Sequence, residues 1–229
     1  MIGVKIVAVI PALNEEGSIG RVVAGVPRNL VAEVIVVNNG STDRTAEVAA
    51  SAGARIISEV ERGYGAACKA GLDAASEADI LVYLDGDASD QPEELGNVLR
   101  PLLRGEADLV IGSRLLGRRE AGAMPPHAVL GNWLTARLVR LLYGVRITDL
   151  GSFRAVRRTH LVALDMRERT YGWPIEMIVK AARRGYRIHE VPVTHRKRIG
   201  KSKVAGTVVG SLKAAYSILF TAFRYVMRP

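Results

Sequence analysis

The sequence predicts an α/β protein with a mostly parallel sheet flanked by helices. Short apolar runs alternate with helical stretches through the first half of the chain, a rhythm that is typical of βαβ units. Of the 229 residues, 48% are hydrophobic and 24% are charged, which is the composition of a globular protein with a sizeable core. The length fits one large domain or a domain with an appendage.

The first half of the chain is predicted to form strands and helices in turn. Apolar runs bounded by turn residues predict strands at residues 4–10, 33–37, 55–58, 80–84 and 109–113. The helices between them are predicted at residues 18–26, 42–52, 65–75 and 92–104. Capping and first-turn residues mark three of the helix starts, in Asn14-Glu15-Glu16, Ser41-Thr42-Asp43 and Pro92-Glu93-Glu94.

The rhythm changes after Arg114. Residues 115–126 are rich in Gly and Pro and predict a loop. An amphipathic helix is predicted at residues 129–143, further helical pieces at 161–164 and 175–184, and a strand at 187–193. No linker composition separates two domains, so we expect one domain over residues 1–203 and an apolar C-terminal helix over residues 204–229.

Two places for that C-terminal helix remain open. Residues 204–227 carry only two charges, Lys213 and Arg224, and the uninterrupted apolar stretch covers residues 214–223. This stretch is shorter than the ~20 residues that a membrane-spanning helix needs. The helix therefore packs on the core or lies in the membrane interface, with its aromatic side chains at headgroup depth.

The charge of the chain is positive and unevenly distributed. The formal net charge is +9, and residues 183–203 contain eight basic residues against Glu190 alone. Such a segment attracts phosphate in nucleic acid, anionic lipid or a phosphorylated substrate, or it forms a solvated basic surface. The basic residues do not alternate with aromatic ones, and no nucleic-acid recognition signature is present, so we expect no nucleic-acid partner.

Asp85-Gly86-Asp87 is the most informative motif. It directly follows the apolar run that predicts a buried strand, so two carboxylates stand at the carboxyl end of that strand. Open α/β sheets bind ligands at this edge. The two anions repel each other unless a cation neutralises them, and hard oxygen ligands suit Mg²⁺ or Mn²⁺ shared with substrate phosphates. The alternative is an ordinary Asp-x-Asp turn.

Polar residues also follow the other predicted strands. Pro11 to Glu16 follow the first strand, Asn38 to Asp43 the second, and the glycine-containing segment from Glu61 to Ala67 the third. The first stretch could reach a ligand, and the second could reach a base or ribose. The third could approach phosphates. Each stretch also has a purely structural alternative, such as helix capping by Asn14 or an Asn-Gly turn.

In their order and spacing these motifs resemble family 2 glycosyltransferases, and specifically the dolichyl-phosphate mannose and glucose synthase-like branch. Further matches are Ile111-Gly112-Ser113-Arg114, Thr148-Asp149-Leu150-Gly151-Ser152-Phe153-Arg154, Gly172-Trp173-Pro174-Ile175-Glu176, Glu190-Val191-Pro192-Val193 and Arg198-Ile199-Gly200-Lys201-Ser202-Lys203. The resemblance covers nearly the whole chain. It implies a GT-A fold, an inverting mechanism, a nucleoside-diphosphate-sugar donor, and Mg²⁺ or Mn²⁺.

The resemblance also implies roles for individual residues on the donor side. Substrate-binding residues would be Pro11, Asn14, Glu15, Asn39, Asp43, Gly65, Asp85 and Gly86. Asn39 departs from the family, which commonly has an Asp facing the base at this position. Asp85 and Asp87 would hold the metal. Ser89 stands where the family often offers a Gln as a further ligand, and Gln91 lies two residues further on.

On the acceptor side the resemblance implies phosphate-binding and catalytic residues. Arg114 would reach the diphosphate or the acceptor phosphate, and Asp149 would lie near the transferred sugar. Arg196, Arg198, Lys201 and Lys203 match a basic loop that clamps phosphates and closes at Gly200. Of these loop residues, Arg198 and Lys203 are expected to act in catalysis together with Arg114 and Asp149.

The expected reaction moves a hexose to a polyprenyl phosphate at a membrane surface. A lipid phosphate is already anionic and needs no strong base, whereas a hydroxyl acceptor needs one, and Asp149 is then the first candidate. The positive charge and the apolar C-terminus favour the lipid phosphate and an anionic surface. We therefore expect a cytoplasmic protein, peripheral on the inner face of the cell membrane. A hydroxyl acceptor or a catalytically silent homologue remain alternatives, and the nucleotide, the sugar and the oligomeric state stay open.

Overall fold

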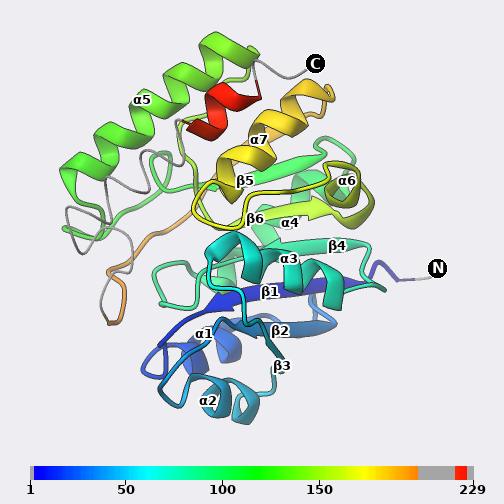
Figure 1. Ribbon diagram of the computed structural model, residues 1–229, viewed down its shortest axis with the longest axis vertical. Helices are drawn as coiled ribbons and strands as arrows, with labels where there is room; N and C mark the ends of the chain where they lie inside the picture. The colour runs from blue at the N-terminus through cyan, green and yellow to red at the C-terminus, as the bar shows by residue number, and fades with distance from the viewer. Residues whose placement is uncertain (1–2, 201–219, 226–229) are drawn as a thin grey trace.

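The computed structural model describes residues 3–200 and 220–225 of the chain. Within these residues one sheet of seven strands forms the centre of the molecule (Figure 1). The strands are β1 (Ile6–Ala12), β2 (Glu33–Asn38), β3 (Arg55–Ser58), β4 (Ile80–Tyr83), β5 (Leu109–Ser113), β6 (Arg154–Arg157) and β7 (Ile188–Pro192). Their order in the sheet is β3-β2-β1-β4-β6-β5-β7.

Helices connect most of these strands. They are α1 (Ile19–Gly25), α2 (Thr45–Ser51), α3 (Tyr64–Ala74), α4 (Leu95–Leu103), α5 (Pro126–Tyr143), α6 (Arg158–Ala163) and α7 (Trp173–Arg183). A short 3₁₀ helix, η1 (Pro92–Glu94), precedes α4. The predicted elements are found with shifts of a few residues at their ends.

One strand was missing from the sequence prediction. β6 runs antiparallel to both β4 and β5, whereas the other neighbouring pairs in the sheet are parallel. Its four residues, Arg-Ala-Val-Arg, have a polar residue at each end and do not look like a buried strand. Arg154 is nevertheless 1% exposed, because its guanidinium donates to the backbone carbonyls of Gly151, Leu150 and Pro174.

Alternation along the strands divides the core into two layers. On β1, Val7 and Val9 face one cluster of buried residues, whereas Ile6, Ala8 and Ile10 face the other. The first cluster lies under α3, α5, α6 and α7, and the second lies under α1, α2 and α4 (Figure 1). Both faces of the sheet are covered, which is why its strands read as nearly continuous apolar runs.

The register of the sheet brings the polar strand ends to one edge. Ala12 of β1 pairs with Asn38 of β2, and Tyr83 of β4 pairs with Arg154, the first residue of the antiparallel β6. The ends of β5 and β7 meet at Ser113 and Pro192. The segments that follow β1, β2, β4, β5 and β7, and the segment that precedes β6, therefore share one side of the molecule, as expected for a ligand site.

Part of the C-terminal region is described. Residues 220–224 have helical backbone, and the segment 220–225 lies beside α5 and α7 (Figure 1). The rest of the helix predicted at residues 204–229 lies outside the described residues, as do Lys201, Lys203 and the predicted domain boundary between them and residue 204. No helix in the described part of the chain is long and apolar enough to cross a membrane.

Candidate active site

A cavity of about 760 Å³ opens at the polar edge of the sheet. Eight residues that the sequence predicts as site residues line it: Pro11, Glu15, Asn39, Asp85, Gly86, Asp87, Arg114 and Arg198. Six others that the structure describes do not: Asn14, Asp43, Gly65, Ser89, Asp149 and Arg196. The cavity thus joins groups from strand ends that are far apart in the sequence.

Asp85 and Asp87 line the cavity, and Asp90 lies beside them without lining it. Asp87 and Asp90 are 5% and 2% exposed, and the Asp90 Oδ2 atom accepts hydrogen bonds from the Asp85 backbone N–H and the Ser152 hydroxyl, each at 3.2 Å. Burial and the charges of Asp87 and Asp90 raise the pKa of the Asp85 carboxyl to about 7. This clustering of anions fits a divalent cation, which would relieve the repulsion between Asp85 and Asp87.

Ser89 is not placed to join these carboxylates. It is 1% exposed, and its backbone N–H donates to Asp87 Oδ1 at 2.9 Å. Its carbonyl accepts a hydrogen bond from the Arg196 backbone N–H. Ser89 therefore shapes the turn that carries Asp87 and does not line the cavity. Gln91 donates to the same carbonyl of Ser89 at 3.4 Å.

The basic loop reaches the carboxylates through Arg198. Arg198 Nη1 lies 3.0 Å from Asp87 Oδ2, and this side chain is 36% exposed. The loop is also bound through its backbone, because Arg196 N–H donates to Ser89 O and Ile199 N–H donates to Asp87 O, both at 2.9 Å. As far as residue 199, the loop is already docked on the Asp85–Asp90 turn. The loop closure at Gly200 that the sequence led us to expect stays a prediction, because residues 201–219 lie outside the described part of the chain.

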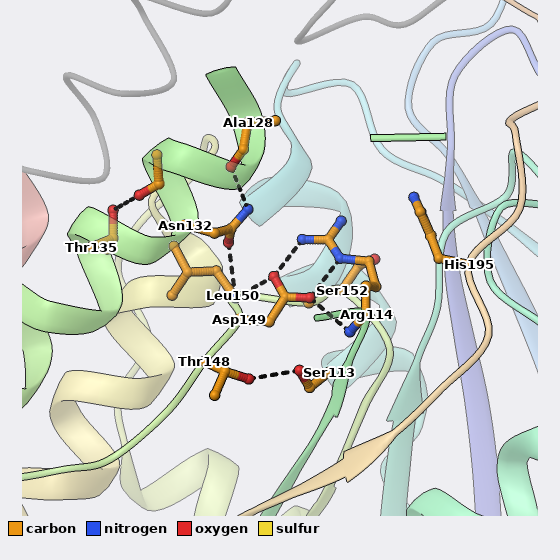
Figure 2. Close-up of polar contacts among 12 residues, drawn as sticks. Ser113, Arg114, Ala128, Asn132, Thr135, Thr148, Asp149, Leu150, Ser152 and His195 are labelled. Carbon is orange, nitrogen blue, oxygen red and sulfur yellow. Dashed lines mark hydrogen bonds and ion pairs between the residues drawn. The ribbon is translucent and has the colours of Figure 1, made fainter. Parts of the chain in front are cut away.

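Arg114 and Asp149 form a buried, bidentate ion pair (Figure 2). Arg114 Nε and Nη2 donate to the two carboxylate oxygens of Asp149 at 2.7 Å each, and the Arg114 backbone N–H donates to Oδ2 at 2.9 Å. Asp149 is 0% exposed. Burial alone raises the pKa of this carboxyl, but the hydrogen bonds and charge of Arg114 outweigh that effect and hold the pKa below its ordinary value.

The turn that carries Asp149 is held from two sides. Glu190 on β7 accepts hydrogen bonds from the Thr148 and Asp149 backbone N–H groups, at 2.8 and 3.0 Å. Asn132 on α5 accepts one from the Leu150 N–H at 3.1 Å (Figure 2). The position of the Arg114 guanidinium in the cavity is thus fixed through Asp149 by a turn that strand and helix both anchor.

The loops after β1 and β2 are tied to each other. The Asn14 Oδ1 atom accepts from the Thr42 N–H at 2.8 Å, and the Asn14 N–H donates to the Ser41 hydroxyl at 3.0 Å. Asp43 accepts from the Thr45 and Glu16 backbone N–H groups at 3.0 and 3.3 Å. Asn14 and Asp43, predicted to bind substrate, are therefore engaged in structural contacts at the edge of the cavity.

Asn39 holds the loop after β3. Its Nδ2 group donates to the carbonyls of Glu59 and Glu61 at 3.1 and 2.7 Å, and its Oδ1 atom accepts from the Gly63 N–H at 2.8 Å. An Asp at this position has no hydrogen to donate to those two carbonyls. The departure from the family pattern at Asn39 thus has a structural reason in this chain.

The small residues before α3 serve close packing of backbone rather than phosphate approach. A Cβ atom on Gly65 would lie 2.2 Å from the Glu168 carbonyl oxygen, and one on Gly63 would lie 2.1 Å from that of Arg169. The Ala66 N–H donates to Arg169 O at 2.9 Å. The segment 168–169 occupies the space beside Gly65, so this glycine has a packing role, and its contact with substrate stays a prediction.

Sequence reasoning missed several residues of the site. Asp90 completes the carboxylate cluster, and its place three residues after Asp87 was the available signal. His195 is 5% exposed and lines the cavity, with Nδ1 at 3.9 Å from Asp90 Oδ1; it directly precedes the basic run.

A carboxylate cluster faced by arginines at the carboxyl edge of such a sheet is the arrangement that the sequence resemblance implied. The family model described as glycosyl transferase family 2 matches residues 7–164. The chain belongs to this family. As a family 2 glycosyltransferase it is an enzyme, and its relatives include proteins named as hexose and mannose transferases.

Three relatives of this glycosyltransferase match it over most of their length. An uncharacterised glycosyltransferase of Mycobacterium tuberculosis is 38% identical over 93% of this chain and 96% of the relative. A dolichyl-phosphate hexose transferase of Haloferax volcanii is 37% identical over 83% and 82% of the two chains. An undecaprenyl-phosphate mannosyltransferase of Micrococcus luteus is 33% identical over 90% of each. These names support the branch to which the sequence was assigned.

Solved structures confirm the fold. Glucosyl-3-phosphoglycerate synthase from Mycobacterium tuberculosis, crystallised with phosphoglyceric acid, superposes with a TM-score of 0.80 at 28% identity, over 99% of this chain and 81% of that one. The same synthase has been crystallised with Mn²⁺, uridine diphosphate and phosphoglyceric acid, with a TM-score of 0.80 at 27% identity, over 99% and 80% of the two chains. The family 2 glycosyltransferase described here therefore has the GT-A fold.

Proposed function

We propose that this glycosyltransferase moves a hexose from a nucleoside-diphosphate sugar to a polyprenyl phosphate, with inversion at the anomeric carbon. The observation that carries the proposal is the cavity that Asp85 and Asp87 line together with Arg114 and Arg198. Carboxylates and guanidinium groups in one cavity suit a metal-bound diphosphate and a second phosphate. The relatives named for polyprenyl-phosphate substrates support the acceptor.

Asp85 and Asp87 would hold Mg²⁺ or Mn²⁺. The cation, when bound, neutralises charge that develops on the departing diphosphate. Arg198 lies on Asp87 at 3.0 Å and supplies a positive charge at the same place. Its guanidinium is free to turn toward substrate phosphate once the charge of Asp87 is shared with a cation, because a charged pair at a partly exposed site is weak.

The state of Asp149 supports a phosphate acceptor over a hydroxyl. A hydroxyl acceptor needs a base that takes its proton, but the pKa of Asp149 is lowered and both of its oxygens accept hydrogen bonds from Arg114 and Leu150. We propose that Asp149 positions Arg114, whose guanidinium would bind the acceptor phosphate. The acceptor phosphate would then attack as an anion without general-base assistance.

One wall of the cavity is apolar and would suit the first isoprenoid units. It is formed by residues of the loop before α5, of α5 itself, and of the start of α7: Ala123, Met124, Pro125, Ala128, Pro174 and Ile175. Leu150 and Tyr171 join them. Apolar lining next to an arginine matches the chemistry of a phosphate on a hydrocarbon chain.

The outer surface of α5 supports a peripheral place on the membrane. Leu130, Trp133 and Leu134 are 56%, 47% and 52% exposed, and the Arg137 guanidinium lies 4.8 Å from the centre of the Trp133 ring. Phe220 and Phe223 are each 51% exposed. Exposed aromatic and aliphatic side chains beside arginines suit an anionic bilayer surface. We place this surface on the inner, cytoplasmic face of the cell membrane.

A second candidate differs in the acceptor. The synthase with the TM-score of 0.80 was crystallised with phosphoglyceric acid, which is a small phosphorylated molecule with a hydroxyl group. The same donor chemistry on such a hydroxyl would need a base other than Asp149, and His195 is the buried, cavity-lining group that could take that role.

The test is transfer from UDP- and GDP-hexoses to a short polyprenyl phosphate in the presence of Mn²⁺, with phosphoglyceric acid as the competing acceptor. The proposal expects a glycolipid product that requires metal and disappears in the Asp87→Ala variant. A product on phosphoglyceric acid alone would establish the second candidate. Donor binding without transfer to either acceptor would contradict both candidates.

The membrane part of the proposal is tested by flotation with phosphatidylcholine vesicles that contain phosphatidylglycerol. Replacing Trp133 by Ser and Leu134 by Gln in the full chain should reduce binding, which should also weaken with salt because exposed charges are screened beyond ~10 Å at 0.1 M. Leu103→Gln is the matched control, since Leu103 on α4 is 50% exposed. Equal binding of all three proteins would contradict a membrane role for α5.

A further inference from the structure

Glu176 is a buried carboxylate outside the cavity. It lies on the first turns of α7, is 0% exposed, and interacts with four donor groups. The backbone N–H groups of Arg167 and Glu168 donate to it at 3.0 and 2.7 Å, and Lys180 Nζ lies 2.8 Å away. The fourth donor is the hydroxyl of Tyr225, at 2.5 Å. Such a group is buried only when its partners are well arranged.

Two of these donors belong to a segment that forms a wall of the cavity. Residues 165–172 connect α6 to α7, and Thr170 and Tyr171 from this segment line the cavity. The segment also packs against the start of α3, where the Ala66 N–H donates to Arg169 O at 2.9 Å. The hydrogen bonds to Glu176 therefore hold the end of this segment that lies away from the cavity.

The fourth donor belongs to the C-terminal segment. Thr221 and Ala222 are 0% exposed and Tyr225 is 6% exposed, so one side of the segment 220–225 is packed against the body of the protein. Arg183 Nη1 on α7 donates to Tyr225 O at 2.8 Å, and Arg224 Nη1 lies 3.5 Å from Glu168 Oε1. The two segments that meet on Glu176 are therefore also in direct contact with each other.

We infer that Glu176 and Tyr225 are positioning residues. Their hydrogen bond, called the latch below, joins the C-terminal segment to the segment 165–172. The latch thereby fixes the position of the part of the cavity wall that Thr170 and Tyr171 form. The inference rests on the proposed function, in which this wall contacts the acceptor. Neither residue lines the cavity, so neither touches substrate. The latch makes the C-terminal segment a part of the acceptor side of the site.

The arrangement of the contacts makes the expected effect selective. The carboxylate cluster and Arg198 are held by the β4 turn and the loop after β7, which make their hydrogen bonds elsewhere. Loss of the latch should therefore raise the KM for the acceptor and leave donor affinity unchanged. A merely structural role would instead lower the stability of the whole protein without separating the two substrates.

The test is Tyr225→Phe in the full chain, which keeps the ring and removes only the hydroxyl. Hydrogen exchange at the Arg167 and Glu168 amides should accelerate about tenfold, as expected for the loss of one hydrogen bond to a charged group. Tyr143→Phe is the matched control, because the Tyr143 hydroxyl donates to Ala222 O on the same segment at 2.5 Å but does not touch Glu176. This control should leave exchange at both amides unchanged.

Kinetics with a short polyprenyl phosphate complete the test. Tyr225→Phe should raise the acceptor KM about tenfold while the dissociation constant of the nucleotide stays within about twofold. Glu176→Gln, if it folds, should likewise raise the acceptor KM and leave the dissociation constant of the nucleotide unchanged. Unchanged amide exchange in Tyr225→Phe overturns the latch even if the enzyme is active. Accelerated exchange supports the latch even if no polyprenyl phosphate is glycosylated, an outcome that would count against the proposed function alone.

Discussion

The loops after β1 and β2 and the loops after β4 and β5 carry polar side chains of similar kinds, but these side chains have different partners. Asn14, Asn39 and Asp43 make their hydrogen bonds to backbone groups of neighbouring loops. Asp85, Asp87 and Arg114 face other charged groups and the cavity. The first set orders the rim, whereas the second set holds charge that a ligand can neutralise.

This difference separates binding groups from structural ones more sharply than residue type does. A carboxylate that accepts two backbone N–H bonds, as Asp43 does, is satisfied without a ligand. The carboxyl of Asp85 has a pKa raised to about 7 because it is buried near Asp87 and Asp90. A perturbed carboxyl in a cleft is the group that gains most from a bound cation.

The largest effect is expected for Asp87→Ala. Removing this carboxylate should abolish metal-dependent binding of the donor nucleotide, because several kcal/mol of charge stabilisation are lost with a metal ligand. Calorimetry with Mn²⁺ and UDP or GDP measures it. Asp43→Ala is the control from the other set and should cost about 1 kcal/mol of stability through the lost hydrogen bonds from the Thr45 and Glu16 N–H groups, without changing nucleotide affinity. If Asp87→Ala kept wild-type nucleotide affinity, or if Asp43→Ala lost it, the assignment of binding and structural roles to the two sets would be wrong.

Asp149→Asn should have the next largest effect. The change leaves Arg114 without its charged partner, and breaking a buried pair costs about 3–5 kcal/mol of unfolding free energy. Turnover should fall as well, since the guanidinium loses its fixed position. Denaturant unfolding and steady-state rates measure the two effects. Arg187→Gln breaks the more exposed pair with Asp108 and should cost much less, because solvent screens this pair. Similar costs for both variants would contradict the assignment of a special role to Arg114 and Asp149.

Asn39→Asp tests the first set directly. The variant cannot donate to the carbonyls of Glu59 and Glu61, so stability should fall by about 1–3 kcal/mol and nucleotide affinity should weaken with the loop. Asn38→Asp is the control, because a carboxylate can still accept the Ser41 N–H bond that Asn38 Oδ1 accepts at 3.0 Å. Thermal unfolding and nucleotide titration distinguish the two. If Asn39→Asp binds nucleotide more tightly, the side chain acts on the base and not on the loop.

The smallest effect concerns pH. Folding raises the pKa of Asp85 from 3.8 to about 7, so the folded protein binds a proton that the unfolded chain releases over this range. Without metal, the contribution of Asp85 to stability is therefore full below about pH 4 and is lost as the pH rises through about 7. Protons compete with metal, so Mn²⁺ affinity should rise at most about tenfold per pH unit up to about pH 7 and then level off. Calorimetry from about pH 5 to about pH 9 tests this, and affinity that does not change with pH would contradict it.

The order of elements was predictable because hydrophobic periodicity reports local burial. Both faces of the sheet are covered, and runs such as residues 80–84 therefore indicated strands. β6 was not predicted, because its burial depends on the carbonyls of residues 150, 151 and 174, which accept hydrogen bonds from the Arg154 guanidinium. Lys201, Lys203 and most of the predicted C-terminal helix stay predictions, since they lie outside the described residues.

Candidate residues of the site were predictable from their place at strand ends, since the carboxyl ends of parallel strands meet at one edge of a sheet. Which of them bind and which support was not predictable. Asn39 donates hydrogen bonds to the carbonyls of Glu59 and Glu61. Asp149 forms an ion pair with Arg114, and Glu176 accepts a hydrogen bond from Tyr225. All of these contacts join distant parts of the chain. Local sequence sets which residues face the core or the edge, but only the tertiary structure decides which polar groups reach the cavity and which are held by distant parts of the chain, because those partners meet only on folding.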